Sequence, residues 1–168
     1  MKKRKIYITP VFEDDENNIS FKLNSNFDIS GIQFTLSGFR DGSFYQFADI
    51  GTLTNRNNKK SKTKYKWREK SIMEVYDFMV SVNSHNGNIM AVSFNNNTIR
   101  SGHSHLFTIP VVKNIDCRKF KKYCIRDLVV SDRNGNNLVE GLKNVGRCIH
   151  SFNQNDLIKN SLTDIENL

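Results

Sequence analysis

Residues 29–38 have the sequence ISGIQFTLSG, which predicts a β-strand with one dry face and one wet face. Ile32, Phe34 and Leu36 alternate with the polar residues at positions 33, 35 and 37. Successive side chains of a strand point to opposite faces, so this period places the three apolar residues together on one side. The stretch therefore predicts a sheet that buries one face and exposes the other.

The same two-residue period recurs along the chain. It predicts further strands at residues 4–9, 19–24, 76–83, 89–94, 106–112, 124–130 and from 137 onward, with Pro10 ending the first of them. Turn sequences at 26–28 and 84–88 predict hairpins on either side of them, and residues 39–53 fit either a strand or a packed loop. Pro110 favours an edge or a bulge in its strand. This density of short strands predicts an all-β sandwich.

The chain divides into a sandwich over residues 1–150 and a different segment over 151–168. In the second segment Ile158, Leu162 and Ile165 follow a helical spacing, which predicts a short amphipathic C-terminal helix. A helix of about thirteen residues is marginal by itself, so it is expected to pack on its own sandwich or on a partner.

The positive charge is concentrated in one segment. The formal net charge is +8, and residues 55–70 carry +7 of it. These basic residues are Arg56, Lys59, Lys60, Lys62, Lys64, Lys66, Arg68 and Lys70, opposed only by Glu69. The high isoelectric point therefore belongs to this insertion and not to the whole domain.

The basic segment has three interpretations. It is a solvated connection that protects a sheet edge, a docking element for an acidic protein face, or a polyanion-binding finger in which Tyr65 and Trp67 stack on bases. Nucleic-acid-binding domains usually carry a basic face, so one basic loop on a neutral domain is a weak indication of that function.

The composition indicates compartment and redox state. Neither a signal-peptide core nor an apolar run long enough to span a bilayer is present, so we expect a protein made in the cytoplasm. We therefore expect reduced thiols at Cys117, Cys124 and Cys148. The alternative is a Cys117–Cys124 bridge across a hairpin. The richness in Asn, Lys and Ile is typical of AT-rich genomes, including those of many large DNA viruses.

Four stretches resemble the strand signatures of cohesin domains. They are ISGIQFTL at 29–36, GNIMAVSF at 87–94, IRSGHSHLFTI at 99–109 and VVSDRNGN at 129–136, in the family's order and spacing over about residues 4–139. Two positions depart from the pattern, with Arg100 in place of the usual proline and Ser104 in place of the second glycine. The resemblance implies a jelly-roll sandwich of about nine strands that binds proteins or carbohydrate and catalyses nothing. Free-standing domains of this kind resemble modules in virus-encoded proteins.

Several candidate sites can be drawn from the sequence, and none predicts a cofactor. His103 and His105 have a metal-ligand spacing but need a third ligand, such as His85 or Asp132. A four-ligand set of Cys117, Cys124, Cys148 and His150 fits no usual zinc spacing. The turn at 132–137 lacks the ligand pattern of a calcium loop. The acidic run at 13–16 could collect Ca²⁺, but an acidic run in a turn is usually solvated. No phosphate loop, nucleophile elbow or paired-acid motif is recognisable.

The sequence predicts a non-catalytic protein–protein attachment module, with a structural or assembly role in a virion as a minor capsid or capsid-associated component. Binding is expected through the basic segment, which guides encounter, and through burial of Ile158, Leu162 and Ile165 on a neighbour. One alternative is a carbohydrate-binding module in which Tyr45, Trp67 and Tyr76 form a stacking platform. A third is nucleic-acid binding by the basic segment, with a steep salt dependence.

Overall fold

The computed structural model describes residues 4–55, 70–119, 122–142 and 145–150 of the chain. Their strands form two antiparallel sheets. The first has the order β1 (Ile6–Glu13), β2 (Asn18–Ser25), β8 (Gly102–Lys113) and β4 (Tyr45–Phe47). The second has the order β10 (Cys148–His150), β9 (Lys122–Ser131), β3 (Gly31–Leu36), β7 (Asn88–Val92), β6 (Met79–Val82) and β5 (Thr52–Leu53). The described part therefore holds ten strands, and the all-β prediction is confirmed.

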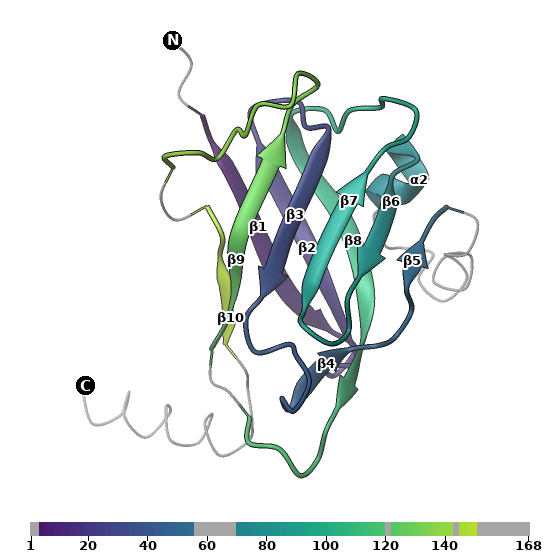
Figure 1. The fold of residues 1–168 in the computed structure, drawn as a ribbon, viewed down its shortest axis with the longest axis vertical. Coiled ribbons are helices and arrows are strands. Elements are labelled where there is room, and N and C mark those ends of the chain that lie inside the picture. The colour runs from purple at the N-terminus through teal and green to yellow at the C-terminus, as the bar shows by residue number, and fades with distance from the viewer. Residues whose placement is uncertain (1–3, 56–69, 120–121, 143–144, 151–168) are drawn as a thin grey trace.

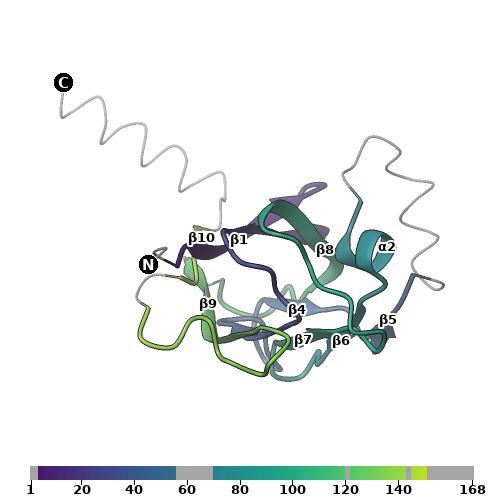
Figure 2. The same ribbon diagram turned by 90° about the horizontal axis from the view of Figure 1, so that it is seen from above.

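The two sheets lie face to face with an aromatic core between them. Figure 1 shows β9, β3, β7 and β6 in front of β1, β2 and β8, and Figure 2 shows the two layers from above. The ring of Phe21 on β2 lies 5.0 Å from that of Phe34 on β3 and 5.3 Å from that of Phe107 on β8. The first contact joins the two sheets and the second lies within one sheet, and packing of this kind between inner faces stabilises a sandwich.

The strand at residues 29–38 behaves as its period predicts. In β3 the side chains of Ile32, Phe34 and Leu36 are buried, while Gln33 between them is exposed. β3 pairs with β7 on one side and β9 on the other, so it lies inside the larger sheet. The hairpin between β6 and β7 is also confirmed, with Gly87 in the left-handed region at φ +76°.

The predicted hairpin through residues 26–28 is wrong. β2 pairs with β1 and β8, whereas β3 pairs with β7 and β9, so the turn carries the chain from one sheet to the other. Apolar alternation identifies a strand that faces the core but does not distinguish which of the two layers it joins. The two dry faces meet across the core instead of lying side by side.

Other boundaries also differ from the sequence prediction. β1 does not end at Pro10 but continues to Glu13, because an edge strand tolerates a residue without an N–H. The irregularity in β8 lies between Phe21 and Lys22 of its partner, not at Pro110. Asn137 forms only an isolated bridge to Ser131, and the last described strand is β10.

A short helix, α2 (Ile72–Tyr76), was not predicted. It begins after Ser71, whose backbone N–H donates to the Glu74 carboxylate at 3.0 Å, and it ends at Asp77 in the left-handed conformation. The signal in the sequence is the Ser-x-x-Glu capping box, which satisfies free N–H groups of the first turn. Ile72 and Met73 are buried, and the helix packs beside β8.

The cysteine prediction is also wrong. Cys124 on β9 and Cys148 on β10 lie opposite each other and form a disulfide, and Cys117 is the free thiol. Neither three reduced thiols nor a Cys117–Cys124 bridge is present. Pairing within the disulfide also removes both cysteines from the four-ligand metal set, because metal ligation needs thiolates.

Candidate functional site

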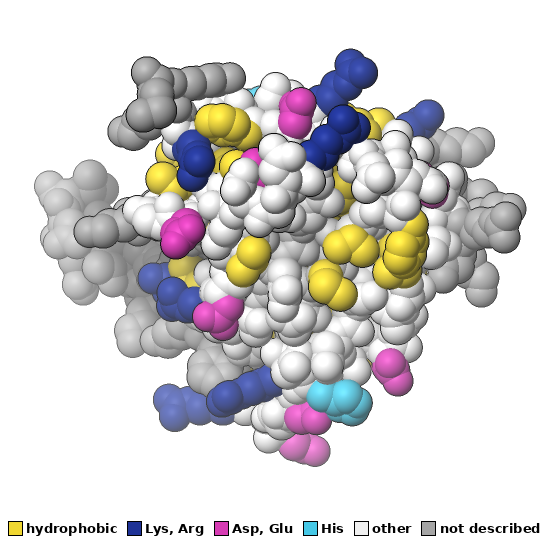
Figure 3. Space-filling view, turned by 45° about the horizontal axis from the view of Figure 1, so that its top comes forward, with side chains coloured by type: hydrophobic (Ala, Val, Ile, Leu, Met, Phe, Trp, Pro, Cys, Tyr) yellow, Lys and Arg dark blue, Asp and Glu magenta, His cyan; other side chains and the backbone are white. Residues whose placement is uncertain are grey.

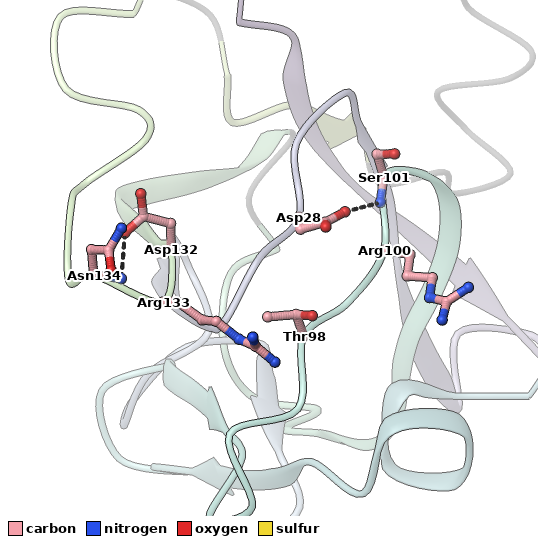
Figure 4. A pocket seen from close by; sticks show the side chains of 7 residues that line it. All are labelled: Asp28, Thr98, Arg100, Ser101, Asp132, Arg133 and Asn134. Carbon is pink, nitrogen blue, oxygen red and sulfur yellow. Dashed lines mark hydrogen bonds between the residues drawn. The ribbon is translucent and has the colours of Figure 1, made fainter.

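Three loops at one end of the sandwich enclose an open hollow with a volume of about 630 Å³. They are the β2–β3, β7–β8 and β9–β10 connections, which Figure 1 places at the top of the molecule. We call the hollow the arginine cleft, and Figure 4 shows its lining residues: Asp28, Thr98, Arg100, Ser101, Asp132, Arg133 and Asn134.

Backbone hydrogen bonds between the loops hold the cleft together. Ile29 and Ile99 exchange both of their backbone hydrogen bonds, at 2.9 and 2.7 Å, which joins the β2–β3 loop to the β7–β8 loop. The Ser30 N–H donates to the Ser131 carbonyl at 2.7 Å, which joins the same loop to the end of β9. In the chain Ile29 follows Asp28, and Ile99 lies between Thr98 and Arg100. The backbone hydrogen bonds of the two isoleucines therefore fix the positions of these lining residues.

The two aspartates of the cleft are engaged in structural hydrogen bonds. Asp28 Oδ1 accepts from the Ser101 N–H at 2.9 Å. Asp132 Oδ1 accepts from the N–H groups of Asn134 and Asn136, and its Oδ2 accepts from the Asn136 side chain. The Asn136 side chain and backbone lower the pKa of Asp132 by stabilising the ionised carboxylate. The turn predicted here is confirmed.

Most N–H donors of the two arginines of the cleft make no hydrogen bond with a described residue. Arg133 donates from Nη2 to the Asn96 carbonyl at 3.2 Å, whereas the Arg100 guanidinium makes no hydrogen bond or ion pair with any described residue. In Figure 4 Arg133 extends toward Thr98, and Arg100 lies beyond Thr98. Arg4 is near enough to contribute to the lowered pKa of Asp132. Donors in this arrangement can bind an anion.

A second hollow of about 490 Å³ adjoins the cleft. It shares Thr98, Arg100 and Arg133 with the first and is completed by Asn97 and by Val75 and Tyr76 of α2. Val75 and Tyr76 also line a third hollow, beside Lys70 and His103. Apolar and aromatic surface of α2 therefore lies between the two arginines and the described end of the basic segment.

The outward surface of the larger sheet is uncharged over two adjacent rows. The strand register aligns Val129, Gln33, Met90, Ser81 and Thr52 in one row across five strands. The next row contains Ser131, Gly31, Val92 and Met79. We call these nine residues the outer face. Met90 and Val129 are 40% and 42% exposed, and Figure 3 shows white and hydrophobic side chains at the centre of this side, with charged groups toward its border.

Most of the residues predicted to bind a partner lie outside the described part of the chain. This holds for Arg56, Lys59, Lys60, Lys62, Lys64, Lys66 and Arg68, and for Ile158, Leu162 and Ile165 of the predicted C-terminal helix. Lys70 is described, and it is exposed beside α2. The roles of these residues therefore stay predictions.

The structure buries one residue of the predicted carbohydrate platform and one residue of the predicted histidine pair. Tyr45 has no exposed surface and cannot stack on a sugar, while Trp67 lies outside the described residues. His103 is exposed but His105 is buried, with its Nε2 3.0 Å from the Thr108 hydroxyl. Within the described ranges no group of three or more His, Cys, Asp or Glu side chains could hold a metal ion. Those ranges also contain no helix long and apolar enough to cross a membrane.

Sequence reasoning missed the cleft because each of its loops reads only as a turn. The available signal was the presence of an arginine in two of these turns, Arg100 and Arg133. No family model matches the chain, and neither a curated protein nor a solved structure is significantly similar to it.

Proposed function

We propose that this protein is a non-catalytic attachment module that binds another protein through the outer face of its larger sheet. The observation that carries the proposal is the pair of adjacent, uncharged rows that include Met79, Met90, Val92 and Val129. The centres of protein interfaces are depleted of charged side chains and enriched in Met and aromatic residues. Exposed Met and Val side chains also gain free energy when a partner removes them from water.

The resemblance to cohesin domains supports the same function. Its four stretches fall on β3, on β7, on the first part of β8 with the residues before it, and on the end of β9 with the following turn. We infer the attachment role from the binding function of cohesin domains. We infer a structural role in a virion from the likeness of free-standing domains of this kind to modules in virus-encoded proteins, and from the Asn-, Lys- and Ile-rich composition. The basic segment and the predicted C-terminal helix are additional contacts in this proposal.

A photo-cross-linking experiment tests the attachment face. Ser81 lies in the first row of the outer face, where it pairs in register with Met90 and Thr52. A benzoylphenylalanine introduced at Ser81 should cross-link to one specific protein in cells that make this chain. The matched control places the same group at Asn24 on β2, which belongs to the other sheet.

A variant that places a charge at the centre of the outer face extends the cross-linking experiment. Gln33 is exposed, so Gln33→Arg should change the free energy of unfolding by no more than about 0.5 kcal/mol. It should nevertheless abolish the cross-link from Ser81, because a partner would have to desolvate the new guanidinium. Equal cross-linking from Ser81 and Asn24, none from either, or a product unaffected by Gln33→Arg contradicts the proposal.

A further inference from the structure

We propose that the arginine cleft binds the carboxylate side chains of an acidic peptide segment. The source of the segment, a partner protein, rests on the proposed attachment function. The recognition itself rests on Arg100 and Arg133, which line both the cleft and the hollow beside it. The outer face and the cleft are separate surfaces, and each has its own experiment.

Most of the guanidinium donors that line the cleft have no hydrogen-bond acceptor among the described residues. Arg100 has no polar partner among the described residues, and Arg133 uses one donor on the Asn96 carbonyl. A guanidinium presents parallel N–H groups that match the two oxygens of a carboxylate, and such bidentate pairs are among the stronger hydrogen-bonded contacts in proteins. The hydroxyl-bearing residues Thr98 and Ser101 lie in the same lining. Two carboxylates could be held in this way.

The charge balance of the cleft favours carboxylates over a dense polyanion. Asp28 and Asp132 line the same cleft as the two arginines, and the hydrogen bonds of Asp132 with Asn136 lower its pKa and favour the ionised carboxylate. A phosphodiester or sulfated chain would bring many negative charges close to both aspartates, and like charges repel. A glutamate peptide carries one charge per residue on a flexible side chain, so its carboxylates can reach the guanidinium groups with less repulsion than the groups of a sulfated chain.

Apolar surface next to the arginines suits a peptide. Val75 is 54% exposed and lines the neighbouring hollow together with Tyr76. Phe94 is 77% exposed and lies in the connection whose Asn96 carbonyl binds Arg133. Beyond α2 the third hollow adds Lys70. A segment that alternates acidic and apolar side chains would find both kinds of contact along this route.

Calorimetric titration of the full chain with blocked hexaglutamate tests the assignment, with blocked hexaglutamine as the uncharged peptide. We expect saturable binding of hexaglutamate only. The double variant R100Q/R133Q should weaken it by about tenfold or more, as expected for the loss of charge-assisted hydrogen bonds. R40Q/R118Q removes the same charge from two exposed arginines outside the cleft and should leave the affinity within about twofold.

Two further arms separate carboxylate recognition from general attraction. R100K/R133K keeps the charge but loses the planar fork, so it should also weaken hexaglutamate binding. A heparin hexasaccharide should bind no more tightly than hexaglutamate. The proposal is overturned if hexaglutamate fails to saturate, if both glutamine double variants weaken it equally, if the lysine variant binds like the native protein, or if heparin binds more tightly. Failure of these titrations leaves the cross-linking result at Ser81 unchanged, and the converse also holds.

Discussion

The hydroxyl of Tyr45 donates a hydrogen bond to the carboxylate of Glu16 at the end of the sandwich opposite the arginine cleft. Lys119 completes the arrangement, with its Nζ 3.3 Å from Glu16 Oε2 and 5.3 Å from the centre of the Tyr45 ring. The Tyr45 side chain is fully buried among Phe12, Phe39 and Tyr123. A cluster of this kind joins the β1–β2 turn to β4 and to the β8–β9 connection.

The protonation of Tyr45 should make the fold sensitive to alkaline pH. Burial, followed by the hydrogen bond and charge of Glu16, raises the pKa of Tyr45 far above its ordinary value of 10.0. The contribution of Tyr45 to the free energy of unfolding is fully present below pH 10. It is lost as the pH rises further, because the tyrosine of the unfolded chain ionises while that of the folded chain keeps its proton. Urea unfolding measured from pH 8 to 11.5 should therefore show stability falling by at most about 1.4 kcal/mol per pH unit from this residue above pH 10.

Tyr45→Phe should flatten that decline, because the phenol that titrates is gone. At pH 7 the variant should be less stable by about 1–2 kcal/mol through loss of the hydrogen bond to a charged group. Tyr7→Phe removes a phenol from the edge strand β1 and is the matched control, which should retain the native alkaline slope. An unchanged slope in Tyr45→Phe would show that other groups govern the alkaline limb.

Gly87 should be far less tolerant of a side chain than Gly135, although both have left-handed backbones. Their φ angles are +76° and +80°. A Cβ at Gly87 would lie 2.3 Å from the Phe39 carbonyl oxygen, whereas one at Gly135 would meet nothing within 4 Å. Gly135→Ala should cost about 1–2 kcal/mol from the backbone conformation alone, and Gly87→Ala about 1–3 kcal/mol more from overpacking. Equal unfolding midpoints for the two variants in urea would contradict the close packing of this hairpin.

The cross-strand pair of Ser20 and Thr108 should contribute to stability as a unit. Their hydroxyl oxygens lie 2.7 Å apart across β2 and β8, and Ser20 also donates to Glu13 at 2.8 Å. Ser20 is fully buried, so its removal leaves a partner unsatisfied. A double-mutant cycle of Ser20→Ala and Thr108→Val should give a coupling free energy of about 1 kcal/mol, and strictly additive effects would show that the contact contributes nothing.

The longer strands could be predicted from the sequence because each carries a pattern of its own, whereas β10 was not predicted and β4 and β5 fall in the stretch that fitted either a strand or a loop. The alternation around Phe34 and the β6–β7 hairpin depend on neighbouring residues only, and both are confirmed. The placement of β2 and β3 in different sheets could not be predicted in this way. Ile19 and Ile32 face the same core from opposite layers, and the period of either strand is unchanged by that choice.

The arginine cleft and the outer face depend on pairings that single segments do not encode. Asp28, Arg100 and Arg133 come from three connections far apart in the chain, and each connection alone reads as a turn. The row through Gln33, Met90 and Val129 exists only because three strands have a particular register. Local sequence constrains such surfaces weakly, since their residues are exposed and individually unremarkable in composition.

The disulfide between Cys124 and Cys148 yields the last prediction. It closes a separation of 24 residues and anchors β10, a strand of only three residues, to β9. Cross-linking lowers the entropy of the unfolded chain, so Cys124→Ala together with Cys148→Ala should lower the free energy of unfolding by about 3 kcal/mol. Cys117→Ala should leave the disulfide in place. A thiol assay on unfolded, unreduced protein should count one thiol for the native chain and none for Cys117→Ala. A count of three thiols in the native chain would contradict the disulfide and show that all three cysteines are reduced, as expected from the sequence. The double variant would then lose stability only through side-chain packing.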